Sequence, residues 1–356
     1  MSDNIPLELQ VELIKRVHVK SLLQFRSVSK EWKSIIDSPD FGDDYCLRHS
    51  QPRLLIRYLP YDTFICNNYK YVLIAADDDD TFHQRQFLTA ALPESVNDSR
   101  MVGCSHGLVC FYGFDASDRS PMAVVWNPWI RKSVDVPVPN VLFVPYETIL
   151  GFGVSPQTKD PKIVKIISSI HPKADTSVPT PWRVEVFTLS SGTWKTPSNN
   201  LPFRNSIRFR WGQVALDGVI YWLAFEWIKV DDGLQLHNLI MSFDLSSEGF
   251  QEVRLPDNLA CRNIYDLSIS KRMESIVVVE KTRNTFVVWM MGQGVTKSFT
   301  KLFNVITRGS SFCIVSEFMK NGEPIVDHGS DALFAYDLYS ERIKYLGIAG
   351  QSRRFS

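Results

Sequence analysis

A short pattern that recurs along most of the chain limits the folds that this sequence can adopt. It consists of an apolar pair, a small polar or acidic residue, a turn, and a bulky residue with a closing apolar step. Full copies begin at Val124, Val184, Ile240 and Leu333, and a degenerate copy begins at Val287. Equivalent positions in successive copies are 61, 56, 46 and 47 residues apart. A period of roughly fifty residues built from strands indicates propeller blades, because a helical solenoid would show amphipathic helices in each repeat.

A second recurring element precedes some of these copies. Segments that start at residues 103 and 214 place a polar residue and a glycine between β-like residues, at 106–107 and 217–218. Such pairs favour positive φ and suit two-residue hairpin turns. Dividing residues 53–350 by roughly fifty residues per blade predicts about six blades. The segment before residue 103 holds no clear copy of either element.

The first fifty residues show a helical period instead. From residue 6 to residue 17 the apolar side chains form two adjacent stripes, which are Pro6, Leu9, Leu13 and Val17, and Leu7, Val11 and Ile14. At about 100° per residue the stripes together span about 200°, whereas a helix that covers one side of a small domain needs little more than about 100°. Either neighbouring helices bury both stripes, or one stripe packs internally and the other meets a partner helix.

Two shorter helices are predicted to follow. The first covers residues 21–26, and the second ends before Pro39. The second of them has four apolar residues at helical spacing, which are Val28, Trp32, Ile35 and Ile36. Three short helices enclose only a small core, which another protein usually completes. After residue 52 the helical period is replaced by short apolar runs between Gly, Pro, Asn and Asp, so we predict that the remainder is all-β.

The charge balance and the termini narrow the choice of partners and compartment. The chain of 356 residues holds 39 basic and 39 acidic side chains, which argues against a surface for duplex nucleic acid. The first residues show no basic segment followed by an apolar one, and no window approaches the roughly 18 apolar residues of a membrane helix. We therefore expect an intracellular protein, cytoplasmic and/or nuclear, with no nucleic-acid or membrane partner.

Metal-ligating residues do not cluster in the sequence. The six cysteines include no Cys-x-x-Cys pair, and the seven histidines include no His-x-x-x-His pair. Residues 77–80 form an acidic run, but Leu88 stands where a calcium loop requires a glutamate. We predict no metal site and no cofactor.

Residues 4–48 resemble an F-box almost without interruption. The matching segments are Ile5–Leu9, Glu12–Ile14, Val19–Leu23, Phe25–Trp32 and Ser38–Phe41. The region that follows resembles the plant F-box-associated, kelch-like domain, through a Gly-Leu-apolar-Cys hairpin at residues 107–110 and a Trp-Asn-Pro step at residues 126–128. Where the family usually has Leu-Pro after the first helix, this chain has Val17-His18. Because that turn is less rigid without proline, we expect weakened docking.

The resemblance implies a small all-α F-box of three short helices followed by an all-β propeller of about six blades. The expected boundaries are 1–48 for the F-box, 49–52 for a connector, 53–350 for the propeller and 351–356 for a tail. It also implies the substrate-recognition subunit of an SCF-type (Skp-cullin-F-box) ubiquitin ligase. In such a ligase the F-box docks on a Skp adaptor, which links it to cullin and a RING subunit, and the second domain captures an unknown target protein for degradation. The chain itself catalyses nothing in this scheme.

Residue roles carry over from the resemblance for the F-box. The adaptor contact would involve Ile5, Pro6, Leu9, Leu13, Val17, Leu22 and Leu23. The core of the module would contain Val28, Trp32, Ile35 and Ile36. Which stripe of the first helix faces outward is left open by the sequence.

Candidates for contact with the target come from the aromatic residues of the β region. Exposed Trp, Tyr and Arg are common anchors in protein interfaces. The candidates are Trp182, Arg208, Arg210, Trp211 and Trp227. Packing inside the blades is the competing explanation for each of them.

Two other functions remain alternatives. One is a Skp-bound scaffold that delivers no substrate. The other is a hydrolase, because residues 103–107 match the Gly-x-Ser-x-Gly nucleophile elbow with Ser105 as the nucleophile. That elbow needs a strand before it and a helix after it, whereas the residues from Leu108 onward favour a second strand.

Overall fold

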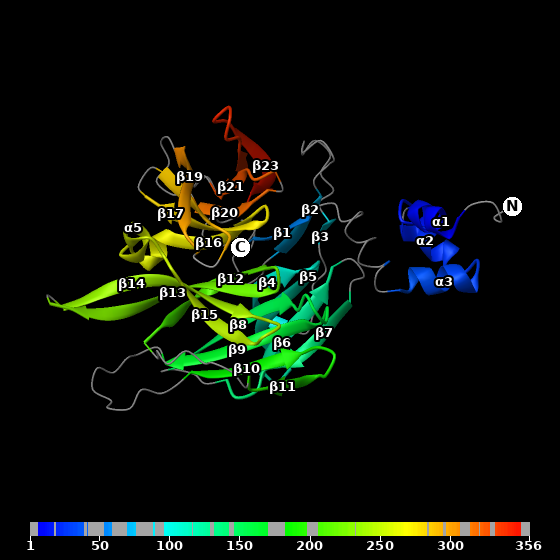
Figure 1. Cartoon of the computed structure of the whole chain (residues 1–356), viewed down its shortest axis with the longest axis horizontal. Coiled ribbons are helices and arrows are strands. Elements are labelled where there is room, and N and C mark those ends of the chain that lie inside the picture. The colour runs from blue at the N-terminus through cyan, green and yellow to red at the C-terminus, as the bar shows by residue number, and fades with distance from the viewer. Residues whose placement is uncertain are drawn as a thin grey trace. The chain divides into compact units, whose positions relative to one another are not determined.

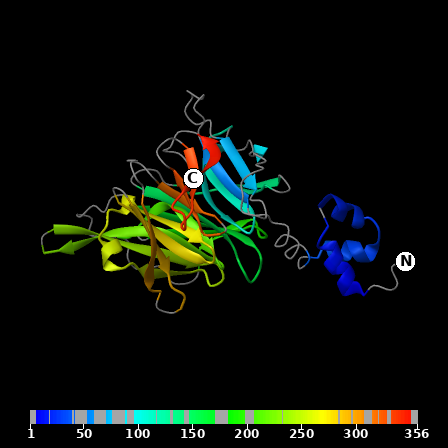
Figure 2. The same cartoon turned by 90° about the horizontal axis from the view of Figure 1, so that it is seen from above.

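The computed structural model describes residues 6–17, 19–38, 41, 53–58, 70–75, 88–89, 96–115, 117–128, 132–141, 146–169, 182–197, 206–231, 233–282, 285–294, 297–306, 314–319, 321–327 and 332–349. The chain divides into two compact units, residues 1–56 with 72–89 and residues 57–71 with 90–356. The helical module belongs to the first unit, and the five four-stranded sheets belong to the second (Figures 1 and 2). No helix in these ranges is long and apolar enough to cross a bilayer.

The described residues of the N-terminal module include the three short helices that the sequence predicts: α1 (Leu7–Ile14), α2 (Val19–Phe25) and α3 (Lys30–Ile36). Pro6 immediately precedes α1, where its fixed φ suits the start of a helix. The hydroxyl oxygen of Ser29 accepts a hydrogen bond from the backbone N–H of Trp32 at 3.1 Å and caps α3. Arg26, in the turn after α2, makes hydrogen bonds of 2.5 and 2.8 Å with the carboxylate of Asp37 at the end of α3. These contacts fix the second and third helices relative to each other.

The core of this module is small. The buried residues are Ile14, Leu22 and Phe41, and Val11, Val17, Trp32, Ile35 and Ile36 pack against them. Val28 does not belong to this core, because the Ser29 cap leaves it outside α3 with 66% of its surface exposed. The prediction of a core position is therefore wrong for Val28.

The described residues of the second unit form five blades, each a four-stranded antiparallel sheet in chain order. Their strands are β4 (Val96–Ser105), β5 (Leu108–Asp115), β6 (Pro121–Asn127) and β7 (Lys132–Pro137); β8 (Tyr146–Val154), β9 (Pro161–Ser169), β10 (Arg183–Thr188) and β11 (Thr193–Lys195); β12 (Arg208–Leu216), β13 (Val219–Val230), β14 (Gly233–Asp244) and β15 (Gly249–Arg254); β16 (Leu267–Arg272), β17 (Ser275–Lys281), β18 (Thr285–Met291) and β19 (Phe299–Ile306); β20 (Ile314–Phe318), β21 (Pro324–Asp327), β22 (Ala332–Tyr336) and β23 (Ile343–Ala349). The first strands of successive blades contact one another. This arrangement is a β-propeller.

The predicted count of about six blades is wrong, because five are found. The strands before them, β1 (Arg53–Tyr58), β2 (Lys70–Ala75) and β3 (Leu88–Thr89), form a three-stranded sheet whose last strand has only two residues. This is the segment in which neither recurring sequence element occurs. The five copies of the first element coincide with the third and fourth strands of the five blades. Counting copies therefore predicts the blades better than dividing the length.

The predicted hairpin turns are confirmed. His106 and Gly107 have φ of 50° and 75° between β4 and β5, and Asp217 and Gly218 have φ of 50° and 76° between β12 and β13. These positive angles belong to the two-residue turns that match the twist of paired strands.

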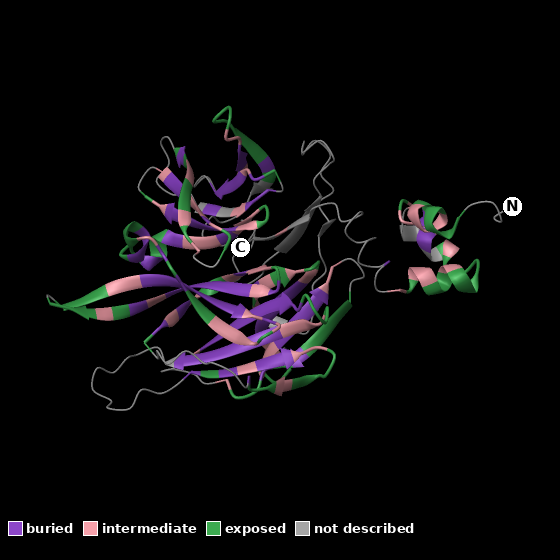
Figure 3. Ribbon diagram, in the orientation of Figure 1, coloured by how far each residue is buried: buried purple, intermediate pink, exposed green. Residues whose placement is uncertain are grey.

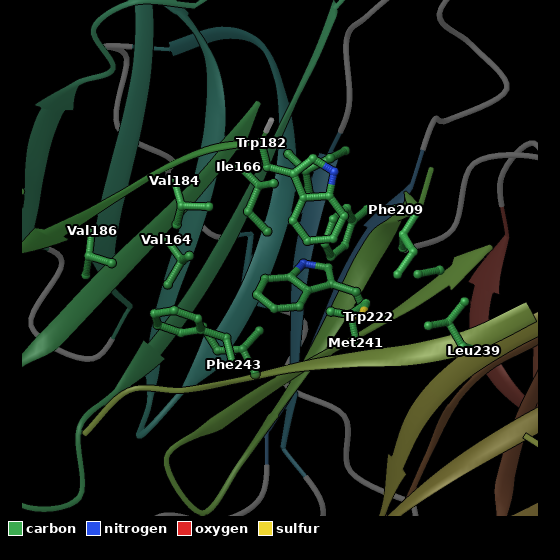
Figure 4. Packing of buried hydrophobic residues seen from close by; sticks show 14 of the residues in the cluster. Val164, Ile166, Trp182, Val184, Val186, Phe209, Trp222, Leu239, Met241 and Phe243 are labelled. Carbon is green, nitrogen blue, oxygen red and sulfur yellow. The ribbon is translucent and has the colours of Figure 1, made fainter. Parts of the chain in front are cut away.

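Hydrophobic clusters fill the space between neighbouring blades. Figure 4 shows the cluster between the second and third blades, in which the rings of Phe209 and Trp222 meet edge to face with centroids 5.8 Å apart. Glycine at position 151 permits this packing, since a Cβ there would lie 2.2 Å from a ring carbon of Trp222. In Figure 3 buried residues run along most strands, whereas the far end of the β13–β14 hairpin is exposed.

Polar contacts also join neighbouring blades. The side-chain amide of Gln213 on β12 both accepts from the backbone N–H of Phe152 and donates to its carbonyl, each at 2.7 Å. Lys165 on β9 is fully buried, donates to the carbonyl of Pro139 at 2.6 Å and pairs with Glu185. Because buried polar groups are costly without partners, these bonds help to specify how the blades are set against one another.

Candidate functional site

The first helix exposes more apolar surface than a helix of a self-sufficient domain needs. Leu7, Leu9 and Leu13 are 53%, 56% and 57% exposed, whereas Ile14 is buried and Val11 packs against the core. Val11 and Ile14 of one stripe therefore pack inside the module, whereas Leu7 at the start of that stripe and Leu9 and Leu13 of the other stripe face solvent. Three exposed leucines on one short helix make a surface suited to an apolar partner.

The other residues predicted to contact an adaptor are placed differently. Pro6 is exposed beside this surface, and Val17 is half-buried against the core. Leu22 is buried in the core, so its assignment to the adaptor surface is corrected. Ile5 and the side chain of Leu23 lie outside the described residues.

Residues 103–107 form a hairpin. Ser105 is the last residue of β4 and pairs with Leu108, the first residue of β5. Its hydroxyl oxygen lies 3.0 Å from Nδ1 of the neighbouring His106. A nucleophile elbow leads from a strand into a helix, whose N-terminal N–H groups stabilise an oxyanion, but here a strand follows the turn. The hairpin explains the match of these residues to the motif.

A bulge in β12 brings Trp211 to the surface of the propeller. The pairing of β12 with β13 shifts between Phe209 and Gln213, and Gly212 supplies the positive φ of 99° in this segment. The indole N–H of Trp211 donates to a carboxylate oxygen of Glu147 at 2.5 Å. Since a bulge re-aims side chains, the sequence around Gly212 is what turns this tryptophan away from the core.

Side chains from three blades gather around Trp211. The guanidinium of Arg100 on β4 lies 4.3 Å from the centre of the Trp211 ring, and the ring of Tyr112 on β5 stacks at 6.5 Å with 16° between the planes. Glu147 comes from β8, and Arg208 begins β12 within its electrostatic reach. We call Arg100, Tyr112, Glu147, Arg208 and Trp211 the arginine–tryptophan cluster.

Two arginines of β12 have lost part of their water shell. Burial lowers the pKa of Arg208, although the nearby Glu147 opposes the shift, and burial also lowers the pKa of Arg210. Arg210 donates to the carbonyl of Ile264 at 3.2 Å and lies 4.9 Å from the ring centre of the exposed Tyr265. Arg210 is thus held by its neighbours, whereas Arg208 lies within the electrostatic reach of Glu147.

The β13–β14 hairpin projects at the end of the propeller where β12 begins. Arg208, the first residue of β12, pairs with Phe225, and beyond that pair the described residues of 226–237 have strand partners only within the hairpin. Two side chains tie this part to neighbouring segments, since Glu226 accepts a hydrogen bond from Ser206 and Gln235 donates to the sulfur of Cys261. Figure 1 shows the β13–β14 hairpin reaching out from the propeller. Its outer part, residues 226–237, which we call the hairpin extension, carries Trp227 and Leu234, which are 48% and 67% exposed. Three of the five predicted target-binding residues lie in the first four positions of β12, namely Arg208, Arg210 and Trp211. A fourth, Trp227, lies on the adjacent strand β13, in the hairpin extension.

Trp182 is the exception. Its side chain is 4% exposed, and its ring centre lies 4.9 Å from that of Phe209 in the cluster between the second and third blades (Figure 4). Core packing accounts for Trp182, so its assignment as a contact with the target is corrected.

Two family models match this chain: the F-box domain over residues 2–44, and the F-box associated beta propeller domain over residues 61–355. The chain belongs to the F-box proteins with an F-box-associated propeller. Among relatives, F-box protein At5g18160 of Arabidopsis thaliana is 24% identical over 295 residues, which cover 82% of this chain and 67% of that protein. F-box protein At3g08750 of the same plant is 27% identical over 312 residues, which cover 85% and 74%.

This F-box protein spans 61% to 74% of the lengths of the first four relatives. Among solved structures, TolB from Acinetobacter baumannii aligns with a TM-score of 0.44 at 11% identity, over 83% of this chain and 64% of TolB.

Sequence reasoning on this F-box protein misses part of the cluster. Arg100, Tyr112 and Glu147 lie far from Trp211 in sequence and meet it only because β4, β5 and β8 belong to neighbouring blades. A weak signal does exist for Tyr112, which lies four positions after Leu108 in the recurring hairpin element. No signal in the sequence marks Glu147 as the acceptor for the indole.

Proposed function

We propose that this protein is the substrate-recognition subunit of a Skp-cullin-F-box ubiquitin ligase. The F-box docks on a Skp-type adaptor, which connects it to cullin and a RING subunit in the cytoplasm or nucleus. The propeller binds a target protein for ubiquitination and degradation. The observation that carries the proposal is the exposed surface of Leu7, Leu9 and Leu13 on a domain that matches the F-box model.

Burial of these leucines supplies a physical basis for docking. Fully burying one leucine side chain stabilises an assembly by about 1.5–3 kcal/mol. Each of the three leucines is more than half exposed in the isolated chain. A partner that covers Leu9 and Leu13 therefore gains a substantial part of this free energy from each of the two side chains. The surface is apolar and small, which suits the helix-in-groove mode of recognition.

The mechanism requires no chemistry from this chain. An F-box bound to the ligase and a propeller bound to the target hold the target near the ubiquitin carrier. Tethering of this kind raises the effective concentration to the millimolar range for short flexible connections. The protein then acts as a non-catalytic adaptor, without a metal or cofactor.

The test is co-purification of the full chain with a Skp-type adaptor and cullin. We expect Leu9→Asp with Leu13→Asp to weaken adaptor binding at least about 100-fold, because two charges replace buried apolar groups. Leu234→Asp is the matched control, since Leu234 is an exposed leucine on the propeller. Full adaptor binding by the double variant would refute the proposal.

Ubiquitination separates a receptor from a scaffold. A receptor should deliver a propeller-bound protein to the reconstituted ligase, and that delivery should stop in the double variant at Leu9 and Leu13. Adaptor and cullin binding without ubiquitination of any propeller-bound protein would identify a scaffold instead.

A further inference from the structure

We propose that the arginine–tryptophan cluster binds a carboxylate-rich, extended segment of the captured protein. The inference rests on the proposed function, because it assumes that the propeller captures a protein, and it adds the chemistry of the segment that is recognised. Three observations support it: the local charge, the exposed ring of Trp211 and the hairpin extension beside it.

Positive charge exceeds negative charge in the cluster. The cluster holds two guanidinium groups, of Arg100 and Arg208, and one carboxylate, that of Glu147, which already accepts a hydrogen bond from the indole of Trp211. Neither guanidinium forms a hydrogen bond or salt bridge with a residue in the described ranges. The whole chain is neutral, so this excess is a local feature. It favours an anionic partner over a neutral one.

The surroundings of Arg100 and Arg208 favour binding of carboxylates in particular. Arg208 is partly desolvated, and a guanidinium that has lost water gains more from a charge-assisted hydrogen bond than one that is fully hydrated. Arg100 lies against the ring of Trp211, which holds the guanidinium in place while its N–H groups stay available. Guanidinium groups fixed in this way bind carboxylates with two parallel hydrogen bonds.

The neighbouring surface favours a peptide over a small anion. The bulge leaves Trp211 38% exposed, and the exposed Trp227 lies two residues beyond the partner of Arg208 in the β12–β13 pairing. Leu234 is a further exposed apolar residue of the hairpin extension. A binding surface with arginines at one point and apolar side chains next to it fits a chain that alternates acidic and aromatic or aliphatic residues.

Fluorescence anisotropy of the full chain bound to its adaptor tests this chemistry. The probes are two labelled peptides of equal length, one alternating Glu and Tyr and the other alternating Gln and Tyr. We expect the Glu-containing peptide to bind at least about tenfold more tightly. Arg100→Gln with Arg208→Gln should abolish this preference. Arg183→Gln with Arg254→Gln should keep it, because these exposed arginines lie on β10 and β15, away from the cluster.

Glu147→Gln supplies a second, independent variant. The amide oxygen of glutamine can still accept the hydrogen bond of the Trp211 indole, but the competing negative charge is gone. We expect this variant to bind the Glu-containing peptide about threefold or more tightly than the wild type, with no change for the Gln-containing peptide. A purely structural role of Glu147 predicts no such gain, so this variant decides the question if the double arginine variant does not fold.

The proposal is overturned if the wild type binds both peptides equally or if the two double variants lose affinity to the same extent. Tighter binding of an oligouridine probe than of the Glu-containing peptide would also overturn it, in favour of single-stranded RNA. Adaptor co-purification is measured on the same samples. If the wild type binds the adaptor but shows no preference between the peptides, this inference alone is refuted. If the wild type does not bind the adaptor, the proposed function is refuted.

Discussion

The F-box module and the propeller differ in how completely each buries its own apolar residues. Among its described residues the module buries Ile14, Leu22 and Phe41 and leaves leucines of α1 in solvent. The propeller places a hydrophobic cluster between every pair of successive blades. The contrast follows from size, because the fraction of surface that a chain can bury rises with its length.

This difference predicts two kinds of binding surface. A module with surplus apolar surface is suited to a partner that completes its core. A propeller whose blades pack through buried apolar clusters presents charged and aromatic groups singly, as at Arg208 at the start of β12 and at Trp211 in its bulge. The two proposed binding events therefore differ in one property, which is how far each region completes its own core.

Tryptophan truncation should have the largest effect, and it should differ between the regions. Trp222 is fully buried between blades, so we expect Trp222→Ala to lower the free energy of unfolding of the propeller by about 3–5 kcal/mol. Trp32 is only half-buried, with its ring centre 5.2 Å from that of Phe25, so Trp32→Ala should cost the module about 1–2 kcal/mol.

Chemical denaturation followed by circular dichroism measures both tryptophan variants. Val134→Ala, at an exposed position of β7, serves as the control and should change stability by less than about 0.5 kcal/mol. Equal losses of unfolding free energy in the Trp222 and Trp32 variants would contradict the predicted difference between the two regions.

Local pattern predicts much of this fold, and the misses have physical causes. The hairpin turns at His106-Gly107 and Asp217-Gly218 depend on residues that tolerate positive φ, so adjacent residues suffice to predict them. The burial of Trp182 depends on Phe209 in another blade, which no local pattern contains. Likewise, the cluster around Trp211 forms only when three blades meet. Sequence thus predicts which residues can act, and tertiary contact decides which of them are exposed.

Removal of a buried ion pair should have the next largest effect. Lys165 is fully buried and Glu185 is mostly so, whereas the Arg26–Asp37 pair of the F-box module is exposed. We expect Lys165→Met to cost about 3 kcal/mol, because Glu185 and the carbonyl of Pro139 lose their partner. Arg26→Gln should change the stability of the module far less, since solvent screens that pair.

Urea unfolding of the two variants compares these ion pairs. Lys132→Met, at an exposed position of β7, controls for the loss of one positive charge. A loss at Lys165 no larger than that at Lys132 would show that the bonds of Lys165 to Glu185 and to the carbonyl of Pro139 do not stabilise the propeller.

Addition of the adaptor should stabilise one region only. A partner that binds the folded F-box at about 100 times its Kd raises the stability of that module by about 2.7 kcal/mol. The propeller should keep its own unfolding transition, because the apolar clusters between its blades are already buried. Hydrogen exchange of the backbone in α1 and in β17, with and without adaptor, measures both effects. Protection that rises equally in both elements would contradict the comparison.

Acid should act on the two regions with opposite sign, through one carboxyl group in each. The hydrogen bonds from Arg26, together with its charge, hold the pKa of Asp37 below its ordinary value. Asp37 therefore stabilises the module above its unfolded pKa of 3.8, and this stabilisation is lost as the pH falls through the lower folded pKa. Asp37→Asn should remove this loss.

Glu317 in the propeller titrates in the other direction. Loss of water around its carboxyl raises its pKa above 4.5, although hydrogen bonds from Ser270 and from the Phe318 N–H and the nearby charge of Lys271 oppose the shift. A raised folded pKa means that the contribution of Glu317 is present below the unfolded value and is lost as the pH rises through the folded one. Glu317→Gln should then gain stability relative to wild type as the pH rises from about 4 to about 7. If instead both variants gain relative to wild type as the pH falls, the two carboxyl groups are in similar environments and the electrostatic part of the contrast fails.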